Sequence, residues 1–130
     1  MSNEPILIID DNAMNLKLEK KLLELERYQV LSAQNAEETL KILEYFRPAL
    51  VLMDFQLPGL DGVDLTKKIR RDPRNKDMVI LMVTSYDQQG DEEKAKAAGC
   101  NGYLHKPLDT QALPGIIAGY LRDGKGQPEK

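Results

Sequence analysis

The sequence predicts an α/β protein built on a doubly wound, five-stranded parallel sheet. Short apolar runs alternate with longer segments of helical periodicity along nearly the whole chain. Two of these runs, residues 49–53 and 78–83, are apolar throughout, which is typical of strands buried on both faces of a parallel sheet. Five strands that alternate with five helices form right-handed βαβ units, and the helices cover both faces of the sheet.

The N-terminal part of the chain contains the first two strands and the first helix. Residues 6–9 are predicted to form the first strand, and Asn12 can cap a helix that runs to about Glu26. Residues 28–33 are predicted to form the second strand. The apolar residues of the helix recur at helical spacing with charged residues between them: Met14, Leu16, Leu18, Leu22, Leu23 and Leu25.

The middle of the chain contains the strand that carries the most unusual residue. The second helix is predicted to begin after Asn35 and to extend through Phe46. The third strand, residues 49–54, then ends on the carboxylate of Asp54. Asp is a poor strand residue, and a charge at the end of a buried strand is costly unless another group pairs with it. The helix that follows stops before Asp72, because a proline comes next.

The last third of the chain completes the alternation. Residues 78–83 are predicted as the fourth strand, residues 90–98 as a helix and residues 100–104 as a short fifth strand. Asp109 or Thr110 is predicted to cap the last helix. For a chain of this length the usual strand order is the flavodoxin-like 2-1-3-4-5, in which ligands bind at the carboxyl ends of the neighbouring strands 1 and 3.

Composition and charge narrow the function classes. The 130 residues are 42% apolar and 30% charged, so we expect one domain over residues 1–122 and a polar tail over 123–130. A net charge of −3 argues against direct nucleic-acid binding, and no apolar run approaches the ~20 residues needed for membrane insertion. The single cysteine, Cys100, excludes an internal disulfide and indicates a reducing compartment, so we expect a cytoplasmic protein.

Charged and polar side chains end four of the five predicted strands. Strand 1 ends on Asp10 and Asp11, strand 3 on Asp54, strand 4 on Thr84 and strand 5 on Lys106. All of them lie at one edge of the sheet, so we expect them to converge. Three carboxylates repel one another, and Mg²⁺, which prefers oxygen ligands and accompanies phosphate, relieves that repulsion. The set predicts phosphoryl transfer, with Asp54 as nucleophile and with Thr84 and Lys106 on phosphoryl oxygens.

A simpler interpretation exists for each of these residues alone, because Asp, Thr and Lys are common at turns and helix starts and on the surface. The coincidence of four such strand ends is what favours a functional site.

Four motifs in this chain resemble the signature of the receiver domain of two-component response regulators. They are Asp10–Asp11, residues 53–62, Thr84–Ser85 and Lys106–Pro107, in the order and spacing of that family. The resemblance spans residues 5 to about 122. The residues most similar to the single-domain cell-division regulators of the family, and to the receivers of hybrid histidine kinases, are Asp11, Asn12 and Asn15, with residues 90–94 and 99–100.

The resemblance implies a role for each site residue. Asp54 would accept a phosphoryl group from a histidine kinase or a histidine phosphotransferase. Mg²⁺ would be bound by Asp11, by Asp54 and by the backbone carbonyl of Gln56, while Asp10 would act through a water molecule. Thr84 and Tyr103 (a residue that could also simply fill the core) would form a switch pair that responds to the phosphoryl group. Gln56 and Tyr86 occupy variable positions that could tune the access of water to it.

The first hypothesis is a stand-alone receiver, which would act on a target protein through the face formed by residues 90–98, the fifth strand and the last helix. Three alternatives remain beside it. A phosphatase of the haloacid-dehalogenase type would carry a second acid two residues after its nucleophile, where this chain has Gln56. A flavodoxin-type carrier would have a phosphate-binding loop rich in Ser, Thr and Gly after strand 1, and this chain has no such loop there. The chain could also be a receiver excised from a larger protein.

Overall fold

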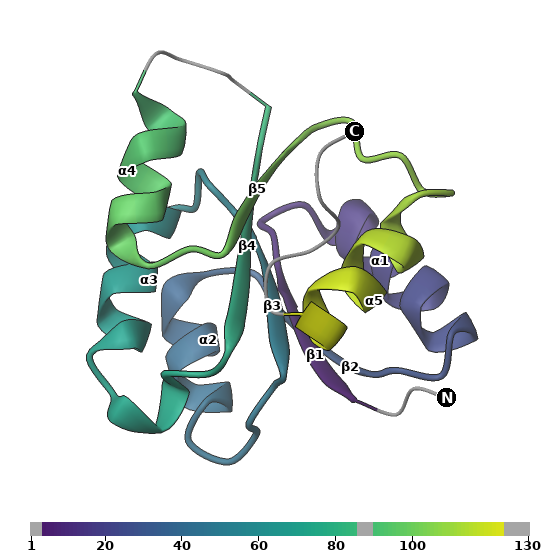
Figure 1. Cartoon of the computed structure of the whole chain (residues 1–130), viewed down its shortest axis with the longest axis horizontal. Coiled ribbons are helices and arrows are strands. Elements are labelled where there is room, and N and C mark those ends of the chain that lie inside the picture. The colour runs from purple at the N-terminus through teal and green to yellow at the C-terminus, as the bar shows by residue number, and fades with distance from the viewer. Residues whose placement is uncertain (1–3, 86–89, 124–130) are drawn as a thin grey trace.

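One parallel sheet lies between two layers of helices in the computed structural model, which describes residues 4–85 and 90–123 (Figure 1). The strand order is β2-β1-β3-β4-β5, so the predicted doubly wound, flavodoxin-like sheet is confirmed. The strands are β1 (Pro5–Ile9), β2 (Gln29–Ala33), β3 (Leu50–Asp54), β4 (Val79–Thr84) and β5 (Gly102–His105). The helices are α1 (Ala13–Leu25), α2 (Ala36–Ile42), α3 (Gly62–Arg70), α4 (Asp91–Ala98) and α5 (Leu113–Asp123), with a short 3-10 helix η1 (Pro73–Asn75) before β4.

Alternate strand residues face two separate cores, because successive side chains of a strand point to opposite faces of the sheet. On β1, Ile6 and Ile8 pack beneath α1 and α5, whereas Leu7 and Ile9 pack beneath α2, α3 and α4 (Figure 1). Every residue of β3 and β4 is buried. The apolar runs are therefore central strands covered on both sides, as predicted. None of the helices in the described ranges is long and apolar enough to cross a membrane.

The helix starts follow the capping residues of the sequence. The side-chain oxygens of Asn12 and Asn35 each accept a hydrogen bond from the backbone N–H three residues later, at 3.0 and 2.9 Å, as predicted. Before α5, the carboxylate of Asp109 accepts the N–H groups two and three residues later, at 3.0 and 3.2 Å. Asp109 rather than Thr110 therefore caps the turn that leads into α5.

The second helix is shorter than predicted. It ends at Ile42, and Phe46 lies outside it. Beyond Ile42 the N–H groups of Glu44 and Tyr45 bond to carbonyls three residues back, at 3.2 and 3.1 Å, so the chain tightens into a turn.

The apolar pattern of α1 does not correspond to one buried face. Leu16 and Leu23 are buried, but Met14, Leu18 and Leu25 are 77%, 54% and 72% exposed. Residues two apart on a helix point about 200° apart, so Leu18 cannot share the inward face of Leu16. Helical spacing alone therefore does not place these three residues in the core.

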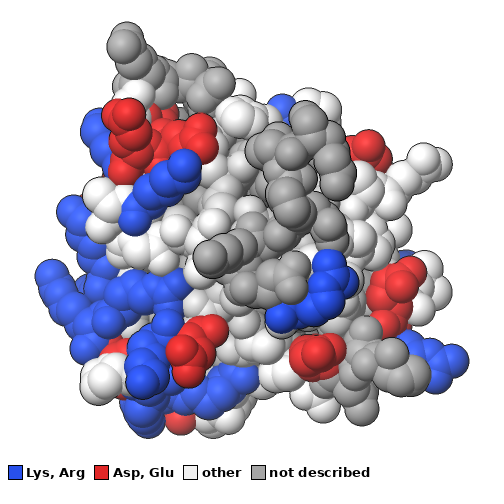
Figure 2. Space-filling view, viewed as in Figure 1, with Lys and Arg blue, Asp and Glu red and all other residues white. Residues whose placement is uncertain are grey.

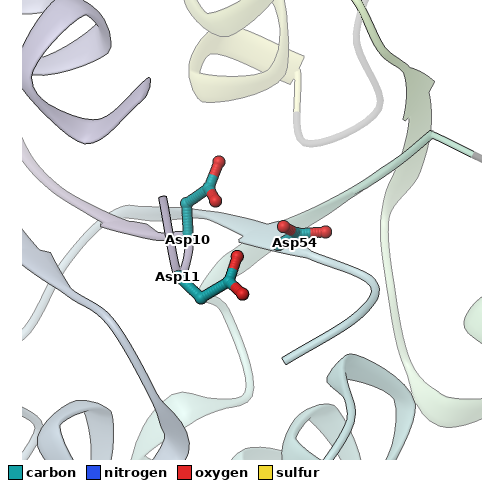
Figure 3. A group of neighbouring side chains, drawn as sticks. All are labelled: Asp10, Asp11 and Asp54. Atoms are coloured by element: carbon teal, nitrogen blue, oxygen red, sulfur yellow. The ribbon is translucent and has the colours of Figure 1, made fainter. Parts of the chain in front are cut away.

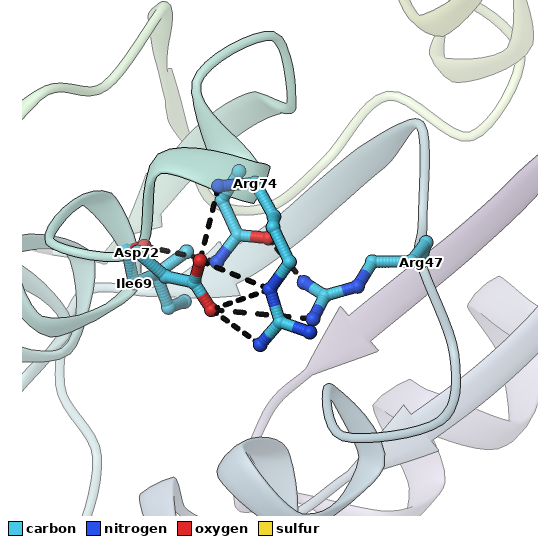
Figure 4. Close-up of polar contacts among 5 residues, drawn as sticks. Arg47, Ile69, Asp72 and Arg74 are labelled. Carbon is cyan, nitrogen blue, oxygen red and sulfur yellow. Dashed lines mark hydrogen bonds and ion pairs between the residues drawn. The ribbon is translucent and has the colours of Figure 1, made fainter.

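Basic side chains gather at the amino-terminal edge of the sheet, at the lower left of Figure 2, over the last turn of α3 and the turn after it. Asp72 stabilises this region (Figure 4). Its carboxylate accepts hydrogen bonds from the backbone N–H of Arg74 at 3.0 Å and from the Arg74 guanidinium at 2.7 and 3.1 Å, and lies 4.0 Å from Arg47. Its own N–H donates to the carbonyl of Ile69. The hydrogen bonds from Arg74 lower the pKa of Asp72 to about 2.

Gly62 holds the first turn of α3 against the end of β3. Its N–H donates to the carbonyl of Phe55 at 2.8 Å. A Cβ atom at this position would lie 2.7 Å from the backbone oxygen of Asp54 and 2.7 Å from the sulfur of Met82. Because a backbone atom is one of the two neighbours, the structure cannot accommodate a side chain here without moving the strand end that carries Asp54.

Gly62→Ala should lower the free energy of unfolding by about 2 kcal/mol, because the added methyl group overpacks the junction of α3 and β3. Gly115→Ala is the matched control, since a Cβ atom there meets nothing within 4 Å. In the helix α5 it should raise stability by about 0.5–1 kcal/mol. Urea denaturation of both variants measures the difference, and equal stabilities would contradict the close contact at Gly62.

Candidate functional site

The carboxyl edge of the sheet brings together residues that are far apart in the sequence. Asp10 follows β1, Asp54 ends β3, Thr84 ends β4 and Lys106 follows β5. β1 and β3 are neighbours in the sheet, with Ile9 opposite Met53 in the register. The chain from β1 to β3 passes through α1 on one face of the sheet and through α2 on the other face. This edge is therefore the topological switch point at which doubly wound proteins bind ligands.

Three carboxylates meet at this point. One oxygen from each of Asp10, Asp11 and Asp54 lies within 4.8 Å of the others (Figure 3). Asp10 and Asp54 are buried, whereas Asp11 is exposed. Hard divalent cations such as Mg²⁺ take oxygen ligands in this type of arrangement, so the donor set fits the predicted metal.

Lys106 is the cation that the structure places against this cluster. Its Nζ atom lies 3.1 Å from Oδ2 of Asp54 and 3.4 Å from Oδ2 of Asp10. Burial disfavours the ammonium, but the hydrogen bond and charge of Asp54, together with Asp10, outweigh burial and raise the pKa of Lys106. Within the described residues, this ammonium contacts two of the three clustered carboxylates, so negative charge is in excess at the site.

Burial raises the pKa of Asp54, and the charge of Asp10 adds to the increase. The hydrogen bond from Lys106 and that from the N–H of Gln56, at 3.2 Å to Oδ1, act in the opposite direction. Both Lys106 and Asp54 therefore have raised pKa values. The lysine lies against two carboxylates, whereas Asp54 is buried beside another carboxylate. A bound cation or phosphoryl group would change this balance directly.

Asp10 is held in place by α1. Its Oδ1 atom accepts the N–H of Asn12 at 2.9 Å, and its Oδ2 atom accepts the side-chain amide of Asn15 at 3.2 Å. The side chain of Asn15 thus helps to position Asp10. Asn15 lies on α1 and not at a strand end, so the pattern of strand-end residues does not predict its role. The family resemblance alone includes that position.

The predicted switch residues lie on the same side of the sheet. Thr84 is buried at the end of β4, on the face that also carries Met82, and Tyr103 on β5 pairs with Met82 in the register. The Tyr103 ring is half-buried and makes edge contacts with Phe55 and His105, with ring centroids 6.3 and 5.4 Å apart. Its contacts place it at the rim of the core, and its switching role stays a prediction.

Tyr86 lies outside the described residues. Gln56 is exposed beside the site. Cys100 packs against the core under α2, α3 and α4, where burial raises the pKa of its thiol to about 11, as expected of a small apolar residue rather than a reactive one.

Glu19 is a charged residue that lies near the site, although its place in the sequence does not predict this position. Helical periodicity assigns it to the solvated face of α1, yet it is half-buried. Burial, together with the charges of Asp10 and Asp54, raises its pKa to about 7 against the opposing effect of Lys106. Because residues far along the chain cause this burial, no local pattern signals it.

Together, the fold and the site define a doubly wound α/β protein with a cluster of three carboxylates at its switch point. The chain belongs to the response regulator receiver domain family, whose model matches residues 6–118. It is 34% identical over 118 residues to the polar-differentiation response regulator DivK of Brucella anthropi, a match that covers 91% of this chain and 96% of that protein. The DivK protein of Brucella ovis is 32% identical over the same lengths.

Solved structures that contain receiver domains are also similar to this chain. The receiver domain of the sensor histidine kinase PA1611 from Pseudomonas aeruginosa, solved with a magnesium ion in its active-site cleft, is 30% identical, with a TM-score of 0.84 over 93% of this chain and 99% of that chain. A chain from the co-crystal structure of the Saccharomyces cerevisiae phosphotransfer protein Ypd1 with the receiver domain of Ssk1 is 28% identical, with a TM-score of 0.85 over 95% of this chain and 92% of that chain.

Glu19→Gln should stabilise the protein at about pH 8 by about 1 kcal/mol after discounting for solvent screening, and should have no effect near pH 4. The native carboxyl retains its proton to about pH 7, whereas an unfolded one loses it near 4.5, so wild-type stability falls as the pH rises through that window. Urea denaturation in EDTA measures the difference.

Glu24→Gln is the control, because Glu24 is exposed on the same helix. An equal effect of the two substitutions at about pH 8 would mean that burial of Glu19 is not the cause.

Proposed function

We propose that this protein is a phosphorylation-controlled signalling module that accepts a phosphoryl group on Asp54. The observation that carries the proposal is the buried Asp54 carboxylate, 3.1 Å from the Lys106 ammonium and clustered with the carboxylates of Asp10 and Asp11. An oxygen of Asp54 attacks the phosphorus of a phosphohistidine, the N–P bond breaks, and the imidazole leaves with the electron pair. The product is an aspartyl phosphate.

Asp11 and Asp54 would hold Mg²⁺ directly with the backbone carbonyl of Gln56, and Asp10 would act through a water molecule. The cluster of three carboxylates supports this assignment. When bound, the ion neutralises charge on the phosphoryl oxygens and on the acids. Lys106, already within hydrogen-bond distance of Asp54, pairs with one phosphoryl oxygen. The hydroxyl of Thr84 donates to another.

The donor we propose is a histidine kinase or a histidine phosphotransferase. The structural similarity to a chain from the Ypd1–Ssk1 co-crystal supports this class of partner. Phosphorylation would draw Thr84 toward the new charge and allow the Tyr103 ring to turn inward, which changes the surface of α4, β5 and α5. A downstream protein would bind that face, and a cytoplasmic location fits both partners.

With Mg²⁺ and acetyl phosphate, the wild-type protein should gain the mass of one base-labile phosphoryl group. Asp54→Asn should gain none, because an amide is no nucleophile and cannot form the acyl phosphate. Intact-mass spectrometry reads the result. An unmodified wild type, or an asparagine variant that still gains the group, would contradict the assignment of Asp54.

Asp11→Ala should weaken Mg²⁺ binding by at least about tenfold, because the site loses one of its charged oxygen ligands. Asp77→Ala is the control, since Asp77 is exposed at the opposite edge of the sheet. Isothermal titration of both variants with MgCl₂ measures the affinities. Equal affinities would show that the ion binds without Asp11.

A further inference from the structure

Positive charge is concentrated in one short stretch of the chain. Residues 67–77 contain six Lys or Arg and two Asp, so this stretch carries +4 while the whole chain carries −3. Five of its cationic side chains are exposed and form what we call the basic patch: Lys67, Lys68, Arg71, Arg74 and Lys76. The patch lies at the amino-terminal edge of the sheet, over the last turn of α3 and the turn after it (Figure 2).

Most of the basic patch has no structural task. Within residues 4–85 and 90–123, no ion pair or side-chain hydrogen bond is formed by four of its members, Lys67, Lys68, Arg71 and Lys76. Arg70, which lies among them, differs in this respect. Its guanidinium donates to the carbonyls of two other residues and to the side chain of Asn101, at 3.0, 2.7 and 2.8 Å. The four exposed charges are therefore not needed to hold the fold together.

The helix dipole explains only part of the patch. A cation in the last turn of a helix is favourable, which accounts for a lysine at the end of α3. Lys67 and Arg71 are four residues apart, however, and like charges at this spacing destabilise a helix. Arg74 and Lys76 lie beyond the helix altogether. A task in binding explains this concentration of like charge better than a task in folding.

A hollow of about 380 Å³ opens beside the basic patch, and Arg74 lines it. Its apolar wall comes from the residues that precede or begin β3 and β4 and from α5: Pro48, Ala49, Met78, Val79, Tyr120 and Leu121. The hollow is also lined by Arg47 and by one acid, Asp77. The guanidiniums of Arg47 and Arg74 lie 4.0 and 2.7 Å from the carboxylate of Asp72, which they share (Figure 4).

An acidic protein segment with one large apolar side chain fits these two features. Carboxylates form charge-assisted hydrogen bonds with ammonium and guanidinium groups, and a patch of one sign speeds the approach of the opposite sign. An apolar side chain gains free energy when a hollow of this kind removes it from water. Nucleic acid fits less well, because it presents sugar and phosphate to the apolar wall and is repelled by the net negative charge of the chain.

We propose that the basic patch and the adjoining hollow form a second interaction surface, which binds an acidic segment of a partner protein. Carboxylates of the segment lie on Lys67, Lys68 and Arg71, and an aromatic or aliphatic side chain enters the hollow. The surface lies at the opposite edge of the sheet from Asp54, so the inference goes beyond the proposed function and does not depend on it. A partner bound there leaves Asp54 open to its phosphodonor.

The test uses a blocked, fluorescent peptide in which aspartates flank one phenylalanine. One matched peptide has asparagine in place of every aspartate, and another has alanine in place of the phenylalanine. Fluorescence anisotropy with the whole chain at low salt should show binding at least about tenfold weaker for the asparagine peptide and about fivefold weaker for the alanine peptide. In the ¹H–¹⁵N spectrum, the aspartate peptide should shift the amides of Lys68, Asn75 and Val79.

Lys67→Gln combined with Arg71→Gln should weaken binding of the aspartate peptide about fivefold, because two exposed charge contacts are lost. Lys17→Gln combined with Lys21→Gln is the matched control. These two lysines are exposed and four residues apart on α1, so the control removes the same charge at the same spacing. It should change the affinity by less than about twofold, because salt screens charges outside the patch.

Several outcomes would overturn the inference. Equal weakening by the two double variants would reduce the effect to net charge. Equal binding of the asparagine or the alanine peptide would show that charge or the hollow plays no part. Tighter binding of duplex DNA of equal charge would assign the patch to nucleic acid. Self-association that Lys67→Gln with Arg71→Gln abolishes, seen by sedimentation, would assign it to a second copy of the chain.

The position of the bound peptide has a separate test. Saturating aspartate peptide should leave the labelling of Asp54 by acetyl phosphate unchanged, because the two sites lie at opposite edges of the sheet. Slower labelling would place the peptide at the phosphoacceptor edge and overturn the inference. A wild-type protein that binds the peptide but is not labelled would fail the proposed function alone.

Discussion

The ion pair between Lys106 and the buried carboxylates of Asp54 and Asp10 is the contact on which the rest of the site depends. Without a cation, buried carboxylates at neighbouring strand ends would repel each other and lose their hydration. With one such cation beside three acids in the described part of the chain, the cluster retains excess negative charge. A hard divalent ion is the kind of group that neutralises such a charge.

The sheet supplies the geometry that this ion pair needs. Parallel strands deliver residues from four parts of the sequence to a single edge, and the helices after them hold the strand ends. Gly62 lets α3 approach Asp54 closely, and Asn15 on α1 fixes the side chain of Asp10. The positions of the site carboxylates therefore depend on how the helices pack against the strand ends. This is why a contact at the start of a helix affects the position of a carboxylate on a strand.

Helix α1 serves both the core and the surface. Leu16 and Leu23 contribute to the core beneath it, whereas Met14 and Leu18 are exposed, and Leu18 and Glu19 line a hollow that Lys106 also lines. Asn15 on the same helix also holds the side chain of Asp10 in place.

The sequence by itself determined the alternation of strands and helices, the two capping asparagines and the strand-end residues, because apolar periodicity and turn chemistry are local properties of the chain. The strand order followed from the usual order for an α/β chain of this length. Tertiary structure alone decided the rest. Which side of α1 faces the sheet depends on how the helix packs, so the exposure of Leu18 and the burial of Glu19 could not be read from spacing. The shared position of Lys106 between Asp54 and Asp10 likewise exists only once distant strands lie side by side, since an ion pair depends on distance in space and not on distance along the chain.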